Sequence, residues 1–461
     1  MGFTFLPNFI ARARLTALCG IVVYTSLIGA ADPANAKGIS LIRDAEIEHN
    51  IHQIAAPLFA AAGLDAEAVK IHLVNDRALN AFVAGGQRIF INTGLLLKVD
   101  QVSEISGVIA HETGHISGGH LARTHDAVRD ASAASILAMA LGAAAALGGQ
   151  GRAGTAIIAT GAQVAQQSFL KYSRIQESAA DQAAVKILAS LDMTPQGLFT
   201  FLDRIGDQEA LATSRQDPYA RSHPLTRDRL SFLQDQITSS RVQEESPAPI
   251  SREDLIRMQA KIWGFLGSPQ KALRRYPESD QSIPAKYARA AAYHRLNRTE
   301  KALHEAVDLI DLEPNNPYFN ELLGQILFES GEVIEAIPLY QVAVDLRPAS
   351  ALLRLGLAQA LIAANDDSLL PAAVKHLEEA TRRDKNIPLA WRQLAVALGR
   401  NGDIGKSALA SAEYNLGIGR PRDAIRFASK AENLLAKGTP GHLRSLDLKA
   451  VAEKAAKKRK K

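Results

Sequence analysis

The segment His111-Glu112-Thr113-Gly114-His115 lies within a stretch that the sequence predicts to be a helix. Residues 104–110 before it are apolar at helical spacing, with small residues that permit close packing. Residues i and i+4 share a face of a helix, so the two imidazoles can bind one metal ion. Glu112 follows the first histidine and can reach a water molecule on that metal. This arrangement predicts the chemistry of a zinc peptidase, in which a carboxylate base activates a metal-bound water.

A third ligand is needed, because catalytic zinc usually has three protein ligands and one open position. A third histidine six residues after His115 would complete one known zinc pattern, but that position is Leu121. His120 is nine residues from His111, about half a turn away around a helix, so we expect it to point away from the metal. We therefore interpret His120 and His125 as surface or packing histidines.

Glu177 is the better candidate for the third ligand. It stands in Glu177-Ser178-Ala179-Ala180-Asp181, where the two acidic residues share one face of a predicted helix and small residues lie between them. Asp181 would then accept the second ring N–H of a ligand histidine, which is a common supporting role near metals. The alternative is a solvated acidic pair with no ligand.

Two further motifs flank these segments. Residues 80–86 with 89–96, Asn-Ala-Phe-Val-Ala-Gly-Gly and Ile-Phe-Ile-Asn-Thr-Gly-Leu-Leu, precede the predicted metal-binding helix, and Ser222-His223-Pro224-Leu225-Thr226 with Arg229 follows the acidic pair. The four segments, in this order, resemble the M48 peptidases, whose pattern includes H-E-x-x-H, E-x-x-x-D and H-P-x-x-x-x-R. The resemblance covers roughly residues 39–233.

The resemblance implies one Zn2+ ion per chain, with His111, His115 and Glu177 as ligands and Glu112 as general base. Asp181 would orient a ligand histidine. His223 and Arg229 would also be catalytic. His223 would either approach the zinc or stabilise the oxyanion of the tetrahedral intermediate, and Arg229 would serve the same charge. A purely structural role of this His-Pro loop is the alternative.

Residues 87–93 alternate in the manner of a strand, with Ile89 and Ile91 on one face and Phe90 on the other. The preceding pair Gly85-Gly86 allows a tight turn. An exposed edge strand beside the metal would hold an extended peptide through backbone hydrogen bonds. An ordinary hairpin strand is the alternative.

Residues 1–36 are typical of a secretory signal peptide. Arg12 and Arg14 precede an apolar core, and Ala34-Asn35-Ala36 supplies a small-residue cleavage site, so cleavage is expected near Ala36-Lys37. An uncleaved anchor is the alternative, although the apolar core is short for a membrane span. The only cysteine, Cys19, lies within this segment, so the mature chain would contain neither disulfides nor cysteine ligands.

The formal net charge of +5 is mild for 461 residues and does not favour nucleic acid as a partner. Positive charge is concentrated in Lys457–Lys461, which we interpret as part of a solvated basic C-terminal tail over residues 437–461. Residues 131–147 and 153–166 are rich in alanine and predict a helical hairpin. The hairpin would cover the site or make peripheral contact with a membrane surface, and a true membrane span is the lesser alternative.

Residues 239–250 are polar with two prolines and predict a linker. After the linker, Pro314 and Pro348 follow similar tripeptides 34 residues apart, which is the tetratricopeptide period. Residues 251–436 therefore resemble a tetratricopeptide array of about four repeats. Such arrays bind extended peptides or partner proteins on a concave surface.

The predicted fold is α+β and mostly helical. A zincin-like metallopeptidase domain with a small sheet, residues 37–238, would precede an all-α tetratricopeptide-repeat solenoid. One group of M48 peptidases with such a tail works in the periplasm of Gram-negative bacteria. That resemblance implies a zinc endopeptidase acting on misfolded or stalled outer-membrane proteins, with repeats that bind these clients or the outer-membrane assembly machinery. The alternatives are a chaperone or scaffold with little proteolysis and a membrane-embedded M48 enzyme.

Overall fold

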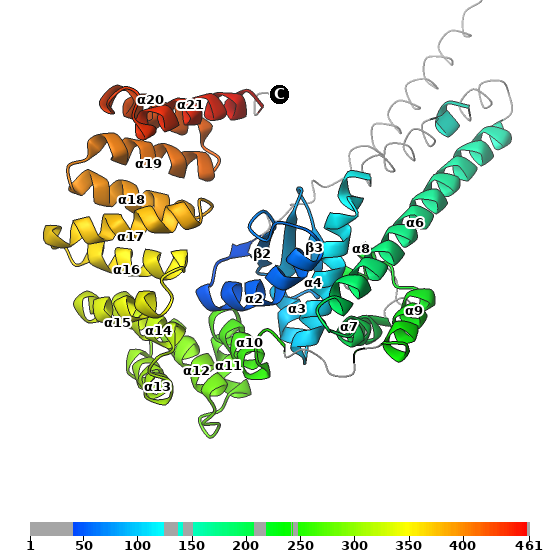
Figure 1. Cartoon of the computed structure of the whole chain (residues 1–461), viewed down its shortest axis with the longest axis horizontal. Helices are drawn as coiled ribbons and strands as arrows, with labels where there is room; N and C mark the ends of the chain where they lie inside the picture. The colour runs from blue at the N-terminus through cyan, green and yellow to red at the C-terminus, as the bar shows by residue number, and fades with distance from the viewer. Residues whose placement is uncertain are drawn as a thin grey trace, which may run out of the picture. The chain divides into compact units, whose positions relative to one another are not determined.

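The computed structural model describes residues 40–123, 137–141, 151–206, 218–240, 242 and 248–458 (Figure 1). The expected signal peptide, most of the first predicted hairpin helix and part of the predicted linker lie outside these residues. No helix among the described residues is both long enough and apolar enough to span a membrane.

The first domain contains a four-stranded sheet. Its order is β1 (Leu41–Ile42), β2 (Lys70–Val74), β4 (Arg88–Asn92) and β3 (Ala81–Val83). Strands β2 and β4 run parallel, whereas β1 and β3 are antiparallel to their neighbours. Gly85 and Gly86 both have positive φ, which confirms the expected tight turn between β3 and β4.

The expected edge strand is the wrong one. Ile89 and Ile91 of β4 are buried and Phe90 is only partly so, in agreement with the predicted alternation. However, β4 pairs with β2 on one side and with β3 on the other, so it has no free edge. The two edge strands are β1 and β3, and β3 is the one that lines the cleft beside the metal-site residues. Alternation in sequence reports the two faces of a strand and says nothing about its neighbours.

Helices pack behind the sheet around a single apolar core. About half of it comes from α2 (Ala45–Ala61), α3 (Thr93–Lys98), α4 (Val102–Ser117) and α7 (Gln196–Gly206), including Ile51, Ile105, Val108 and Phe201. α4 is buried over nearly its whole length, as the apolar spacing before the histidines predicts. α6 (Gly151–Ala189) is one continuous helix that spans the second predicted hairpin helix and ends beyond the acidic pair. Helices α8 (Pro218–Ser222) and α9 (Arg227–Thr238) complete the domain.

The second half of the described chain is entirely helical. Consecutive helices stack as antiparallel pairs, and the spacing from α13 to α15 and from α14 to α16 repeats the 34-residue period of the sequence (Figure 1). The helices are α10 (Arg252–Leu266), α11 (Pro269–Arg275), α12 (Ile283–Arg295), α13 (Thr299–Leu312), α14 (Pro317–Glu329), α15 (Val333–Leu346), α16 (Ala351–Ala363), α17 (Leu370–Arg383), α18 (Pro388–Arg400), α19 (Ile404–Gly417), α20 (Pro421–Leu434) and α21 (Pro440–Lys458). The chain is thus α+β and mostly helical, as expected.

The expected basic tail over residues 437–461 is wrong for most of its length. Pro440–Lys458 form α21, whose Ser445, Leu448 and Ala452 are buried, with Leu448 in one small apolar cluster with residues of α19 and α20. Lysines and alanines dominate the end of this helix in the sequence. The few residues that face the array are widely spaced, so the sequence pattern did not indicate a packed helix. An amphipathic helix of this kind is typical of the polar terminal element that closes a repeat stack.

Candidate metal centre

α4 presents its histidines toward the interior of the first domain. The helix begins with a capping box, in which the Glu104 carboxylate accepts hydrogen bonds from the backbone N–H groups of Asp100 and Gln101 at 2.8 and 3.1 Å. His111 and Glu112 are fully buried on this helix, and His115 is partly exposed. The i, i+4 spacing therefore places both imidazoles on one face, as the sequence predicts.

Close packing of α4 against α6 brings the acidic pair to the histidines. A Cβ atom on Gly114 would lie 2.8 Å from the carbonyl oxygen of Ala180, so the glycine within the motif permits this approach. Glu177 and Asp181 lie one helical turn apart on the side of α6 that faces α4, and both are buried. The small residues between them thus serve the close contact that the sequence suggests.

Four side chains converge on one point. His111, His115, Glu177 and His223 each offer a ligand atom, and these atoms lie within 4.8 Å of one another. The Nε2 atoms of His111 and His115 are 3.1 Å apart, and Glu177 Oε2 is 3.3 Å from His111 Nε2 and 3.1 Å from His223 Nδ1. The geometry brings together all three expected ligands and adds His223 as a fourth donor.

This donor set fits a divalent transition metal. Imidazole nitrogens and a carboxylate oxygen are ligands that zinc accepts. Two ligand nitrogens that face each other at 3.1 Å within a buried site need either a proton or a cation between them. A metal ion satisfies all four donors at once, which a single shared proton cannot do.

Glu112 faces the same site from the α4 side. Within the described residues, neither of its carboxylate oxygens has a hydrogen-bond partner, although His223 Nε2 lies 3.4 Å from Oε1. Glu112 lines a cleft of about 330 Å³ together with His115, Glu177 and His223, and β3 contributes Phe82 and Val83 to its wall. A buried carboxylate without a fixed partner beside a metal site is placed to accept a proton from a water molecule.

Asp181 supports His111 from behind. The Nδ1–H group of His111 donates to Asp181 Oδ1 at 2.9 Å, which leaves Nε2 directed at the ligand cluster. Burial raises the pKa of Asp181, but the charge of Arg229 and the hydrogen bonds from His111 and Arg229 outweigh it, so its pKa lies below the ordinary value. Asp181 is therefore ionised and fixes the tautomer of His111.

Arg229 differs from its expected catalytic role. Its Nε and Nη2 atoms donate to the two oxygens of Asp181 at 2.6 and 2.9 Å, and Nη1 lies 3.1 Å from Glu177 Oε2. The side chain is 4% exposed and is not among the residues that line the cleft. Arg229 thus positions Asp181 and Glu177, because its planar guanidinium group pairs with both of these buried carboxylates.

His120 also differs from expectation. Its Nδ1 atom lies 2.9 Å from Nδ1 of His115, and the ring is buried at the rim of the cleft. The helical-wheel argument fails because α4 ends at Ser117 and Gly119 has φ +64°, so the chain turns back toward the site. His120 is buried like a packing histidine, but it contacts His115 of the metal site instead of pointing away from it.

Tyr219 is a residue that the sequence reasoning missed. Its ring stacks on His223 with centroids 4.5 Å apart and an interplanar angle of 28°, and it is fully buried between His223 and Phe201. Tyr219 and His223 are four residues apart across the short helix α8, and this spacing before the His-Pro pair is the signal that was available.

Comparison with known proteins agrees with this geometry. Residues 43–237 match the family described as peptidase family M48. The beta-barrel assembly-enhancing protease of Yersinia pestis is 26% identical over 401 residues, which are 85% of this chain and 80% of that protein. The protein of the same name from Escherichia coli K12 is also 26% identical, over 87% of this chain and 81% of its own length.

Among solved structures, MamA from Desulfovibrio magneticus RS-1 is 20% identical and covers 36% of this chain and 94% of its own length, with a TM-score of 0.31. The repeat architecture described above follows from the helices of this chain themselves.

Proposed function

We propose that this chain, a metallopeptidase whose residues 43–237 match peptidase family M48, is a zinc-dependent endopeptidase of the bacterial periplasm. The convergence of His111, His115 and Glu177 beside the unpartnered carboxylate of Glu112 carries the proposal. Signal cleavage near Ala36-Lys37 would deliver residues 37–461 to that compartment.

The residue roles follow from the contacts. His111, His115 and Glu177 would hold the ion, which when bound supplies a Lewis acid and lowers the pKa of a coordinated water. Glu112 would accept a proton from a water molecule in the cleft and return it to the leaving amine. Asp181 keeps His111 in the tautomer that leaves Nε2 as the ligand atom, and Arg229 keeps Asp181 and Glu177 in place.

His223 would supply a fourth donor while substrate is absent. A site closed by four protein donors is typical of structural zinc, whereas a catalytic site keeps one position open. The stacking of His223 on Tyr219 and its contact with Glu177 hold the ring at the cluster. A closed site of this kind suits a protease that must spare correctly folded proteins.

β3 would bind the substrate. It is the edge strand of the sheet on the cleft side, and its Phe82 and Val83 share the cleft wall with Glu112 and His115. An extended polypeptide added beside this strand would be held through its backbone, which favours unfolded clients of varied sequence.

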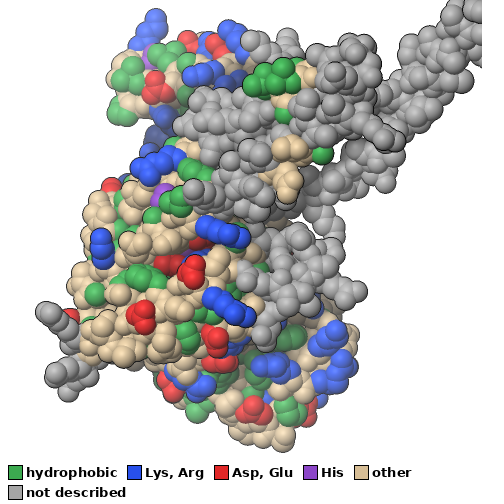
Figure 2. All heavy atoms as spheres, turned by 90° about the vertical axis from the view of Figure 1, so that its right-hand side faces the viewer, with side chains coloured by type: hydrophobic (Ala, Val, Ile, Leu, Met, Phe, Trp, Pro, Cys, Tyr) green, Lys and Arg blue, Asp and Glu red, His purple; other side chains and the backbone are tan. Residues whose placement is uncertain are grey.

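The names of the relatives suggest which clients these are. Proteins called beta-barrel assembly-enhancing protease align with most of this chain, including the helical array. We therefore propose that the clients are stalled or misfolded outer-membrane proteins, and that the array binds these clients or the outer-membrane assembly machinery. Figure 2 shows acidic and basic side chains interspersed on one face of the described residues.

The metal and protease assignments can be tested together. Zinc content and casein cleavage are measured on the exported chain and on Glu112→Gln. We expect one zinc in both proteins and cleavage only by the wild type, with at least about a 100-fold loss in the variant. A folded protein without zinc, or equal cleavage by the variant, contradicts the proposal.

A chaperone or scaffold with little proteolysis is the second candidate, favoured by the four-donor site and the long helical array. Complementation distinguishes the two functions. A Glu112→Gln chain that restores outer-membrane protein assembly in a deletion strain favours the scaffold, and one that fails favours the protease.

A further inference from the structure

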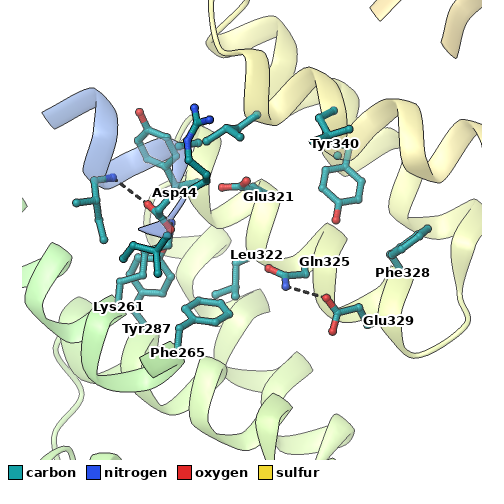
Figure 3. A pocket seen from close by; sticks show the side chains of 18 of the residues that line it. Asp44, Lys261, Phe265, Tyr287, Glu321, Leu322, Gln325, Phe328, Glu329 and Tyr340 are labelled. Atoms are coloured by element: carbon teal, nitrogen blue, oxygen red, sulfur yellow. Dashed lines mark hydrogen bonds and ion pairs between the residues drawn. The ribbon is translucent and has the colours of Figure 1, made fainter. Parts of the chain in front are cut away.

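A cavity of about 480 Å³ lies outside the metal centre, and the protease mechanism does not use it. The start of α2 meets helices α10, α12, α14, α15 and α16 there, so the metallopeptidase domain and the helical array both contribute walls (Figure 3). Several residues that line the cavity are buried, including Tyr287, Leu322 and Leu355.

One carboxylate in this cavity is unpaired. Glu321 on α14 lines the cavity and makes no hydrogen bond or ion pair within the described part of the chain. The cations in the wall are already engaged: Lys261 Nζ lies 2.9 Å from Asp44 Oδ2, and Arg43 pairs with Glu48 at 2.7 Å. An ionised Glu321 would therefore be an uncompensated negative charge in a partly buried space, which a positively charged ligand would neutralise.

A second carboxylate extends this negative character along the same helix. Glu321, Gln325 and Glu329 are spaced four residues apart on α14, and all three line the cavity. Gln325 donates to Glu329 at 2.8 Å, and His294 lies 2.8 Å from the other Glu329 oxygen, so Glu329 is oriented at the rim (Figure 3). The helix thus offers a polar stripe that runs from the interior of the cavity to its opening.

Aromatic rings form much of the remaining wall. Phe265, Tyr287, Phe328 and Tyr340 line the cavity together with the carboxylates (Figure 3), and Tyr318 lines it as well. Tyr340 is held between two glycines, since a Cβ atom on Gly324 or Gly356 would approach its ring at 3.3 or 2.8 Å. Aromatic faces attract cations and pack against the methylene stem of a long side chain.

We propose that this cavity binds a lysine or arginine side chain of an extended polypeptide, with Glu321 as the group that recognises the positive charge. The apolar stem lies against the aromatic wall, and the backbone of the polypeptide continues past the rim at Glu329. The inference rests on the proposed function in one respect, which is that unfolded polypeptides are the clients.

The ionisation of Glu321 agrees with this role. Burial raises the pKa of its carboxyl to about 7, Lys261 opposes the rise, and the charges of Asp44 and Glu46 add to it. An empty cavity therefore disfavours the charged form. A bound lysine or arginine side chain favours the ionised form of Glu321, because it supplies the positive charge that no free cation among the described residues of the cavity wall provides.

Matched peptides test the proposal. The probe is an acetylated and amidated fluorescent nonapeptide of serine, threonine and asparagine with one central residue, which is lysine, arginine, acetyl-lysine or glutamate. Fluorescence anisotropy at pH 8 and low salt measures its binding to the full exported chain carrying Glu112→Gln, so that no peptide is cleaved. We expect lysine and arginine peptides to bind about tenfold more tightly than the acetyl-lysine peptide.

Glu321→Gln should bring that ratio close to one. Glu335→Gln removes the same charge from an exposed site on α15 that does not line the cavity, and it should keep the full ratio. Glu329→Gln serves as a second variant and should reduce the ratio about two- to threefold. Thermal unfolding of each variant verifies that it is folded.

Equal binding of the lysine and acetyl-lysine peptides overturns the proposal, as does a lysine preference that survives Glu321→Gln. Tighter binding of the glutamate peptide overturns it as well, because Lys261 would then be the recognising group. Cleavage of casein by the wild type is measured separately. A chain that cleaves casein without a lysine preference refutes only the cavity, and a chain with the preference but no cleavage refutes only the protease function.

Discussion

Nδ1 of His120 lies 2.9 Å from Nδ1 of His115. The other ring nitrogen of His115, Nε2, faces the metal site. His120 therefore contacts His115 on the side of the ring that is turned away from the metal site. Burial, followed by the positive charges of His115 and Arg123, lowers the pKa of His120 to about 4. A neutral His120 accepts the Nδ1–H of His115 and fixes that ring with Nε2 inward. His120 is therefore a positioning residue, in the same relation to His115 as Asp181 is to His111.

Replacing His120 by alanine should weaken metal retention and lower kcat by about tenfold, because His115 loses the partner that sets its tautomer. His120→Asn, which keeps an acceptor, should recover part of both. The measurement is the rate of metal loss to a chelator alongside kcat and KM. His304→Ala, a histidine with an exposed side chain in the array, is the matched control. Unchanged metal retention in His120→Ala would mean that the contact only packs the cleft rim.

Replacing Arg229 by alanine should destabilise the fold by about 3–5 kcal/mol, since Asp181 would remain buried without its charge partner. Urea unfolding measures this loss. Arg229→Lys should recover only part of it, because an ammonium group cannot donate to both Asp181 oxygens in the same planar geometry. If Arg229→Ala lowers cleavage while its unfolding midpoint is unchanged, the arginine acts on the substrate instead.

Removal of the fourth donor should change activity in a direction that identifies the role of His223. If His223 closes the resting site, His223→Ala should raise basal casein cleavage about severalfold, because a closed set of donors becomes an open one. Initial rates on casein, with metal content measured in parallel, decide the point. A fall in rate at full metal occupancy would instead assign His223 to stabilisation of the oxyanion.

The pH dependence of stability should reveal Glu321. Its folded pKa of about 7 exceeds the unfolded value, so the folded chain binds this proton more tightly than the unfolded chain does. The resulting stabilisation is complete below about pH 4 and is lost as pH rises through 7. Glu321→Gln should therefore be more stable than wild type at pH 8, by on the order of 1 kcal/mol, and not at pH 4.

The stability difference can be assigned to Glu321 only if the groups that face it do not titrate between pH 4 and 8. They are Asp44 and Glu46 of the α2 region, Lys261 of α10, Tyr318 of α14 and Tyr340 of α15. Burial raises the pKa of both tyrosines above the ordinary value, so neither titrates between pH 4 and 8. Equal stability differences at the two pH values would show that Glu321 is ordinarily ionised.

Enlarging Gly114 should separate the two helices that form the metal centre. The new Cβ atom of Gly114→Ala would lie 2.8 Å from the Ala180 carbonyl oxygen, so α6 must shift and carry Glu177 away from the histidines. We expect a stability loss of about 1–3 kcal/mol and a larger loss of metal affinity. Calorimetry and metal titration measure the two effects, and unchanged metal affinity would show that α6 tolerates the shift.

The sequence by itself determined the features that depend on local spacing. Histidines four residues apart in an apolar helix, acidic residues four apart in a second helix, and prolines 34 residues apart each predict which side chains share a face or a repeat. These relationships are fixed by the geometry of one helix or one helix pair. The structure brings His111, His115, Glu112, Glu177 and Asp181 together, as the sequence predicted.

Only the tertiary structure decided the relationships between distant segments. His120 reaches His115 because two glycines end the helix, and Arg229 is drawn to Asp181 because that carboxylate is buried beside it. β3 is an edge strand because the order of strands in the sheet depends on pairing, which alternation does not encode. The walls of the cavity around Glu321 come from β1, α2 and five helices of the array, and all of them together determine whether this carboxylate has a partner. Burial and charge pairing are properties of the assembled fold. A sequence pattern predicts them only where both interacting residues lie on one helix.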